Sequence, residues 1–471
     1  MTLFRIADIS GGSAYIFREF VLDRIGYFEL RGPQSYSMNP VILIPEDIIE
    51  TILKELHDDH DTLKKASVVS RSFLPLSQKH LFSIVELDLS RVDTALQRLQ
   101  NLSDVLISRP KISLYVREFK LLDYAELAWE LDAISISKQQ TISEDILPTL
   151  FKALRQVRSL SFSFLSPNRR DVQNWMRNSS SLSSAIIDLC LSPNVTNITI
   201  RNVGNFPLHI LSRCRNLRRL TLGNLQYARQ QVNGSITPDA ETTTEDIKKA
   251  PGSLEIIEVD SSFHVTLPRI SLAQKEPNSA LYLSRLRALR VTGPFVSWKL
   301  NLGLQTIGEI AQTLECFMWC EANDWGGNHT MSSQFDSGAL DLTPMVNLRF
   351  MIFTFIFDIQ ALNWFVKSLE KISGSNLLEE IFIILFPDAW EENAVRDQLP
   401  VWASRLDSIL RCSGFPHLKK VSILVGWFLD EIPKRMPLLH PKPSEKLFVK
   451  PLYTDLEYLW NEVLIKAGIL V

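Results

Sequence analysis

The sequence predicts an α/β chain: a short three-helix unit, then an irregular solenoid with parallel strands on its concave side and helices outside. An apolar triplet recurs along most of the chain, and amphipathic segments lie between several of these triplets. Leucine accounts for 68 of the 471 residues. Apolar residues make up 45% and charged residues 22%, as in ordinary globular proteins, so the chain as a whole is not disordered.

Four regions follow from the pattern. Residues 1–39 have no clear period, and we expect either a poorly attached extension or a strand pair packed on the next domain. Residues 40–82 hold the three helices, and residues 83–432 hold the repeats. A polar, Thr-rich insertion at 227–253 interrupts the repeats. We expect it to be either a plain solvated loop or a loop that is phosphorylated. Residues 433–471 form a tail or cap.

The first helix of the unit has a clear start. Pro45 suits the first turn, and Glu46 and Asp47 suit the positive end of the helix dipole. An apolar stripe follows at helical spacing: Ile48, Ile49, Ile52, Leu53 and Leu56.

Two further helices complete the unit. After the loop His57–Asp61, we expect Asp61 or Thr62 to cap the second helix. Pro75 is expected to bend or restart the third segment, Arg71–Phe82. Three helices in so few residues bury little surface, so we expect the unit to need a partner or a neighbouring domain.

These residues carry a family resemblance. Ile44-Pro45-Glu46-Asp47-Ile48-Ile49, Leu56, Leu63 and Val68-Val69-Ser70-Arg71-Ser72-Phe73 resemble an F-box, which opens with Leu-Pro-x-Glu and closes with Val-Cys/Ser-Arg/Lys-x-Trp/Phe. Ser67–Phe82 is similar to F-box-like proteins expanded in mushroom-forming fungi. Ile44, Asp47 and Phe73 depart from the commonest residues but keep the character of each position.

The resemblance implies a substrate receptor of an SCF-type cullin–RING ubiquitin ligase, cytoplasmic or nuclear. Its F-box would dock on the Skp-type adaptor, and its repeats would capture a protein target, with no catalytic residue and no cofactor. The expected adaptor contacts are Ile44, Pro45, Ile48, Ile49, Ile52, Leu53, Leu56, Val69 and Phe73. The alternatives are a non-catalytic repeat scaffold without a ligase role and a hydrolase with scattered catalytic residues.

The repeat has the form apolar-x-x-apolar-x-apolar, at a mean spacing of about 34 residues, longer than a regular leucine-rich repeat. It predicts a degenerate leucine-rich-repeat plan, with a strand at each triplet and a helix between some of them. The triplets are Phe82/Val85/Leu87, Val116/Phe119/Leu121, Val157/Leu160/Phe162, Val195/Ile198/Ile200, Leu217/Leu220/Leu222, Leu254/Ile257/Val259, Leu286/Leu289/Val291, Leu314/Phe317/Trp319, Leu348/Met351/Phe353, Leu378/Ile381/Ile383 and Leu418/Val421/Ile423.

Residues between the triplet positions should line the concave face, because strand side chains alternate. In the middle repeats they are polar or basic: Asn197, Thr199, Arg201, Arg219, Thr221 and Arg290. Later they are apolar: Met318, Phe350, Ile352, Phe382 and Ile384. This apolar patch is either a partner surface or is covered by the tail, where Leu456, Leu459, Val463 and Leu464 have near-helical spacing. Trp325, in the loop 321–329, is either a second candidate contact or part of the core.

Sequence signals for chemistry are weak. His57-Asp58-Asp59-His60-Asp61 holds metal-ligating types, but neighbouring side chains in a short loop diverge, so we expect no metal site. Cys316 and Cys320 should lie about 13 Å apart on one strand, as free thiols. No nucleophile elbow, Walker loop, zincin or dinucleotide motif is present in the sequence.

Charge and hydropathy argue against nucleic acid and membrane as binding partners. A net charge of −3 and a pI near 6.3 lack the basic footprint of nucleic-acid binding. Val346–Val366 is interrupted by Arg349, Asp358 and Asn363, so a buried strand followed by a helix is favoured over a membrane span. Five widely spaced cysteines indicate a reducing compartment.

Overall fold

The computed structural model describes residues 45–56, 59–69, 73–88, 92–122, 145–163, 173–174, 180–225, 254–260, 263–275, 279–293, 312–321, 341–356, 359–372, 376–386, 392–411, 414–425, 447–451 and 456–470. The predictions for residues 1–39, Ile44, the insertion at 227–253 and Trp325 lie outside these residues.

One parallel sheet runs through the solenoid, as predicted. It has twelve strands in the order β1-β2-β3-β5-β7-β8-β9-β10-β11-β12-β13-β14, so each strand pairs with the next one along the chain apart from the short strands β4 and β6. The strands are β1 Ile84–Asp88, β2 Glu118–Leu122, β3 Ser159–Ser163, β5 Asn197–Arg201, β7 Arg219–Gly223, β8 Ile256–Val259, β9 Ala288–Gly293, β10 Cys316–Glu321, β11 Phe350–Ile356, β12 Glu380–Phe386, β13 Lys420–Val425 and β14 Leu447–Pro451. A separate two-stranded sheet joins β4 Gln173–Asn174 to β6 Val203–Gly204.

The strand register confirms the repeat. The second and third residues of all eleven triplets lie on strands, and the first residue lies two positions before each strand begins. The middle residue of each triplet pairs with the middle residue of the next. The aligned row is Val85, Phe119, Leu160, Ile198, Leu220, Ile257, Leu289, Phe317, Met351, Ile381 and Val421. Every member of this row is buried, because its side chain points towards the helices.

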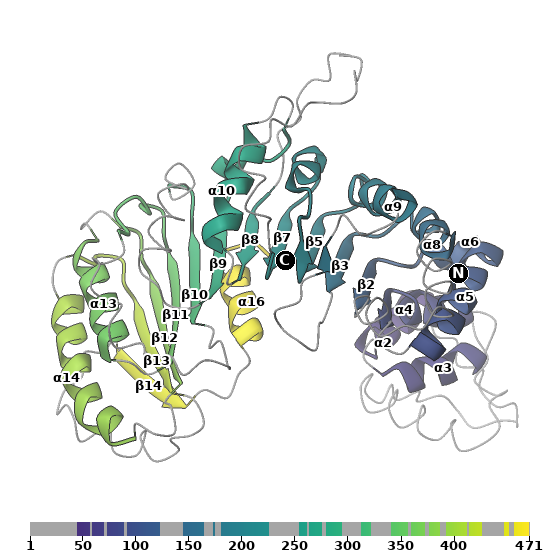
Figure 1. Ribbon diagram of the computed structural model, residues 1–471. Helices are drawn as coiled ribbons and strands as arrows, with labels where there is room; N and C mark the ends of the chain where they lie inside the picture. The colour runs from purple at the N-terminus through teal and green to yellow at the C-terminus, as the bar shows by residue number, and fades with distance from the viewer. Residues whose placement is uncertain are drawn as a thin grey trace, which may run out of the picture.

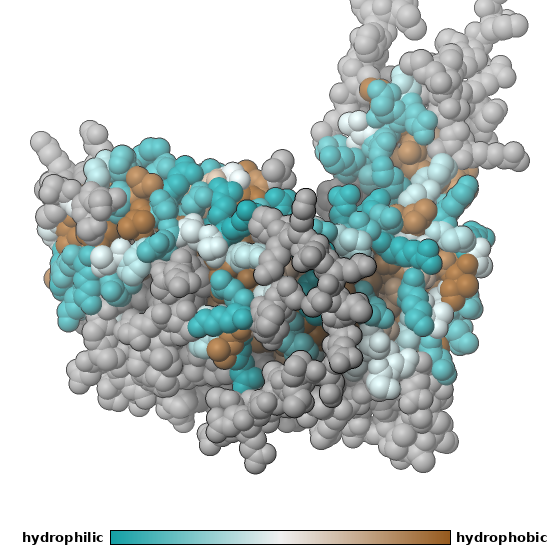
Figure 2. All heavy atoms as spheres, turned by 90° about the horizontal axis from the view of Figure 1, so that it is seen from above, coloured by the Kyte–Doolittle hydropathy of each residue, from teal (hydrophilic) through white to brown (hydrophobic). Residues whose placement is uncertain are grey.

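Helices cover the outer side of the arch that the sheet forms (Figure 1). They are α5 Val92–Ser108, α6 Pro110–Ser113, α8 Leu147–Ala153, α9 Ser180–Cys190, α10 Phe263–Gln274, α13 Ile359–Glu370 and α14 Glu392–Arg411, with the 3₁₀ helices η5 Leu208–Arg213 and η7 Leu283–Arg285. The described surface seen from above is mostly hydrophilic, with small separate hydrophobic areas (Figure 2). The arrangement is therefore an irregular leucine-rich-repeat-like solenoid.

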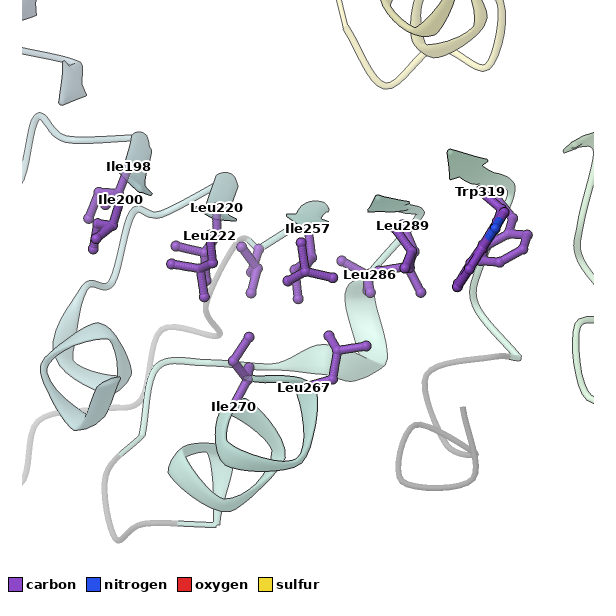
Figure 3. Packing of buried hydrophobic residues seen from close by; sticks show 14 of the residues in the cluster. Ile198, Ile200, Leu220, Leu222, Ile257, Leu267, Ile270, Leu286, Leu289 and Trp319 are labelled. Carbon is purple, nitrogen blue, oxygen red and sulfur yellow. The ribbon is translucent and has the colours of Figure 1, made fainter. Parts of the chain in front are cut away.

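The main core lies between the sheet and these outer helices. Strand residues such as Leu220 and Ile257 point towards Leu267 and Ile270 of α10 (Figure 3). All four side chains are at most 3% exposed. Burying each of them contributes about 1.5–3 kcal/mol. This packing holds α10 together although Pro268 lies inside it.

The stretch Val346–Val366 forms strand β11 and most of helix α13, which confirms a buried strand followed by a helix. None of the helices within the described ranges is long and apolar enough to cross a membrane.

The two ends of the described chain add elements that are not repeats. Three short helices, α2 Glu46–Glu55, α3 His60–Val69 and α4 Phe73–Leu81, precede β1. The tail supplies β14, which the sequence pattern did not predict, and helix α16 Leu456–Lys466. Figure 1 shows α16 on the concave side of the sheet, whereas the other helices of the solenoid lie outside.

Candidate functional site

The N-terminal helical unit, α2 to α4, has a small core of its own. Ile49, Leu53, Leu63, Ala66, Phe73 and Leu76 make it, and Leu56, Val69 and Leu81 pack partly buried against it. The predicted adaptor contacts Ile49, Leu53 and Phe73 are 1%, 0% and 5% exposed. The prediction that these three contact a partner is therefore corrected: they hold the unit together.

Other predicted adaptor residues remain accessible. Ile48 is 38% exposed on α2, and Pro45, Ile52, Leu56 and Val69 are partly buried. Two exposed apolar side chains were missed, Val68 at 83% and Leu74 at 40%. Val68 belongs to the quoted motif and could have been found there; Leu74 has no comparable sequence signal.

The local structure of the unit corrects two expectations. Asp59, and not Asp61 or Thr62, caps α3: the Thr62 backbone N–H donates to Asp59 Oδ1 at 3.0 Å, and the Thr62 hydroxyl donates to Asp59 Oδ2 at 2.7 Å. These hydrogen bonds lower the pKa of Asp59. Pro75 neither bends nor restarts a helix, because it lies in the first turn of α4, where a missing N–H costs no intrahelical bond.

The unit is joined tightly to the solenoid. Only Phe82 and Ser83 separate α4 from β1. Phe82 packs against the main core, and the Ser83 carbonyl accepts the backbone N–H groups of Arg117 at 2.8 Å and Glu118 at 2.9 Å. These hydrogen bonds hold Ser83, the residue that leads from the helical unit into β1, against the start of β2.

The apolar concave patch is covered from within. Met318, Phe350, Ile352, Phe382 and Ile384 are at most 5% exposed and share one cluster with Leu459, Trp460, Val463 and Leu464 of α16. Of the two alternatives for this patch, the structure shows coverage by the tail. The prediction that these five residues form an exposed partner surface is corrected, because a large apolar surface is more stable buried.

Polar contacts fix α16 in place. The Trp460 indole N–H donates to Glu258 Oε1 at 3.0 Å, and Arg287 donates to the carbonyls of Ala467 at 3.0 Å and Gly468 at 3.1 Å. Glu457 pairs with Arg219 at 3.1 Å and also with Arg290. Burial alone would raise the pKa of Glu457, but these two guanidinium groups hold it below its usual value.

The polar concave residues therefore divide into two groups. Arg219, Thr221 and Arg290 are engaged by Glu258 or Glu457 and are not free for a partner. Asn197 and Thr199 are partly buried, and Arg201 is exposed. The open part of the concave face lies over β1 to β5, where Glu86 and Asp88 are also exposed.

A rim runs along the edge of the sheet where the strands begin. We define it as the residue before each strand from β2 to β13: Arg117, Arg158, Thr196, Arg218, Glu255, Arg287, Glu315, Arg349, Glu379 and Lys419. Backbone N–H to carbonyl hydrogen bonds of 2.7–2.9 Å join each member to the next. Adjacent members are therefore one strand spacing apart, about 4.8 Å.

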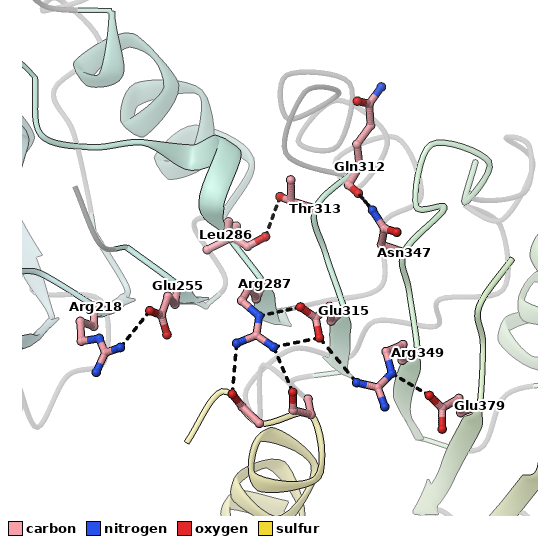
Figure 4. A network of polar contacts seen from close by, with 12 residues as sticks. Arg218, Glu255, Leu286, Arg287, Gln312, Thr313, Glu315, Asn347, Arg349 and Glu379 are labelled. Atoms are coloured by element: carbon pink, nitrogen blue, oxygen red, sulfur yellow. Dashed lines mark hydrogen bonds and ion pairs between the residues drawn. The ribbon is translucent and has the colours of Figure 1, made fainter. Parts of the chain in front are cut away.

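The second half of the rim alternates in charge and is internally paired (Figure 4). Arg218 pairs with Glu255 at 3.0 Å, Arg287 with Glu315 at 2.6 Å, and Arg349 with Glu379 at 2.6 Å. Lys419 also pairs with Glu379 at 2.6 Å, and hydrogen bonds from Lys419 and Arg349 lower the pKa of Glu379. A cavity of about 530 Å³ lies here, lined by Glu255, Ser284, Arg285, Arg287, Thr313, Glu315, Asn347, Arg349 and Leu377.

The first half of the rim is basic. The segments that lead into β2, β3, β5 and β7 are residues 109–117, 152–158, 190–196 and 213–218, and none contains Asp or Glu. Six exposed arginines in these segments have no carboxylate partner among the described residues: Arg109, Arg117, Arg155, Arg158, Arg213 and Arg215. Four of them, Arg117, Arg155, Arg158 and Arg215, lie within four residues of the strand that follows. We call these four residues the basic rim.

The described residues show no cluster of three or more His, Cys, Asp or Glu side chains that could hold a metal ion. Of the loop 57–61, only Asp59, His60 and Asp61 are described. Cys316 and Cys320 are free and buried on β10, as predicted, and burial raises the pKa of Cys316 to about 12. A thiol protonated at neutral pH is a poor nucleophile.

Comparisons with known proteins add little. No known protein-family model matches the chain, and no curated protein is similar to it in sequence. One solved structure with some similarity is an internalin from Listeria monocytogenes, at 12% identity and a TM-score of 0.29 over 87% of this chain and 94% of that one. The register of the sheet, rather than this weak similarity, carries the assignment of the fold.

Proposed function

We propose that the chain is a non-catalytic substrate receptor of an SCF-type ubiquitin ligase. Its N-terminal helical unit binds a Skp-type adaptor, and its solenoid captures a protein target. The observation that carries the proposal is the exposed apolar surface of a very small helical unit. Ile48, Val68 and Leu74 are exposed, and six of the residues described in this unit form its core. Exposed apolar side chains of this size, on a unit that resembles an F-box, suit a helical partner.

The junction between the two parts supports the same role. A receptor acts by proximity, because it raises the concentration of a target near the ligase. A flexible connection would spread the target over many positions. The connection here is two residues long, and Ser83 within it accepts backbone hydrogen bonds from Arg117 and Glu118.

The test is co-expression of residues 38–471 with the Skp-type adaptor of the source organism, followed by size-exclusion chromatography. Ile48→Asp is the informative variant, because Ile48 is exposed and the change leaves the helical core intact. Leu272→Asp on α10 is the matched control: Leu272 is 63% exposed and lies on the solenoid.

We expect an equimolar complex with the unmodified chain and with Leu272→Asp, and its loss with Ile48→Asp. The proposal would be contradicted if the folded protein did not bind the adaptor, or if the complex still formed with Ile48→Asp. The chain would then be a repeat scaffold that binds a protein partner without a ligase role.

A further inference from the structure

We propose that the basic rim, Arg117, Arg155, Arg158 and Arg215, is an interaction surface for an acidic segment of a protein partner. The proposal names the class of target for the receptor function and rests on that function only for what happens to the target afterwards.

The two halves of the continuous rim differ in charge. From Glu255 to Lys419, the rim residues alternate in sign and neutralise one another. From Arg117 to Thr196, the rim carries two arginines and no carboxylate, and Arg218 is the first rim arginine that pairs with a carboxylate, that of Glu255. Arg117 and Arg158 immediately precede neighbouring strands, so their like charges repel. An anionic ligand placed along this edge would relieve that repulsion.

The basic rim is accessible to a protein partner. Helix α16 occupies the concave face beside the paired half of the rim, and Arg287 is bonded to its last turn. The basic rim lies beside the open face over β1 to β5. All four of its arginines are exposed. Among the described residues, the Arg117 guanidinium donates to the backbone carbonyl of Gln156 at 3.3 Å and to its side-chain oxygen at 3.1 Å.

The spacing and charge of the rim positions indicate the length and the chemistry of the ligand. Between the rim positions of β2 and β7 there are three strand spacings, about 14 Å, which an extended peptide covers in about four to five residues. Carboxylates are the natural partners of guanidinium groups. Nucleic acid fits poorly, because a long polyanion would extend beyond these few arginines over a chain whose net charge is −3, whereas a short acidic segment would not.

The test uses the full chain without adaptor, so failure of adaptor binding does not affect it. The probe is a fluorescein-labelled peptide of eight alternating Glu and Ser residues, followed by fluorescence anisotropy at 50 and 200 mM NaCl. The same peptide with Gln in place of Glu is the ligand control. Arg155→Glu with Arg158→Glu removes the surface, and Lys275→Glu with Lys367→Glu, at exposed sites elsewhere, makes the same change in net charge.

We expect saturable binding of the Glu-Ser peptide, with an affinity that falls as the salt concentration rises. Arg155→Glu with Arg158→Glu should lower this affinity by about tenfold, whereas Lys275→Glu with Lys367→Glu should leave it unchanged. No saturable binding, equal effects of the two double variants, or equal binding of the Gln peptide would overturn the proposal. Tighter binding of a single-stranded oligonucleotide of the same length would also overturn it, because the rim would then be a general polyanion surface.

Discussion

Truncation of one aromatic side chain on α16 should detach this helix from the concave face. Trp460 is 0% exposed, and its indole N–H donates to Glu258 at 3.0 Å. Removal of a buried tryptophan leaves a cavity and costs about 3–5 kcal/mol. Glu258 keeps its bonds to Arg219 and Thr221, so we add no further cost for a stranded carboxylate. The docking equilibrium of α16 should therefore fall by roughly a hundredfold or more in Trp460→Ala.

Hydrogen exchange is the suitable assay, because repeat proteins open locally and a single melting curve would average the effect. Trp460→Ala should speed exchange in α16 and in the strands beneath it, β8 to β13. Tyr458→Ala is the matched control, since Tyr458 is an aromatic residue of the same helix that is 61% exposed. Equal exchange in the two variants would refute the reasoning, because Trp460 would then not anchor the helix.

Three further predictions follow from other contacts. The pKa of Glu457 is lowered in the folded state, so its contribution to the docking of α16 is present above the unfolded pKa of about 4.3 and is lost as pH falls from there through the lower folded pKa. Relative to the intrinsic exchange rate at each pH, the protection of the α16 amides should fall in that acid range, and less so in Glu457→Gln. A Cβ at Gly223 would lie 2.6 Å from Asp260 Oδ2, whereas one at Gly414 meets nothing within 4 Å; Gly223→Ala should lower the free energy of unfolding by about 1–3 kcal/mol in urea, and Gly414→Ala should change it little. With its pKa raised to about 12, Cys316 should resist iodoacetamide at pH 8 in the folded chain and react after denaturation, as peptide mass spectrometry can show.

The repeat could be predicted because its signal is local and repeated. The second and third residues of each triplet place two apolar side chains on one side of a strand, and a one-residue slip would expose both. The register from Val85 to Val421 follows from this constraint. β14 has no such triplet in register with the others and was missed.

The candidate sites were harder to predict, for a physical reason. An apolar stripe shows which face of a helix is buried, and does not show what buries it. Ile49 and Leu53 are therefore buried within their own unit, although the resemblance implied a partner. In the same way, the apolar patch around Ile352 is equally compatible with a partner and with α16. The deciding contacts, such as Arg219 with Glu457, join residues 238 positions apart and leave no local pattern.

The position of α16 also bears on how the chain is made. Every strand that α16 covers precedes it in the sequence, so a growing chain presents the patch around Met318 and Ile352 before its cover has been synthesised. Contacts such as that between Glu258 and Trp460, 202 residues apart, close only after the intervening repeats have formed. During that interval the nascent solenoid exposes apolar strands of the kind that chaperones bind and that drive aggregation. The slow step in maturation of this chain should therefore be the docking of its last helix.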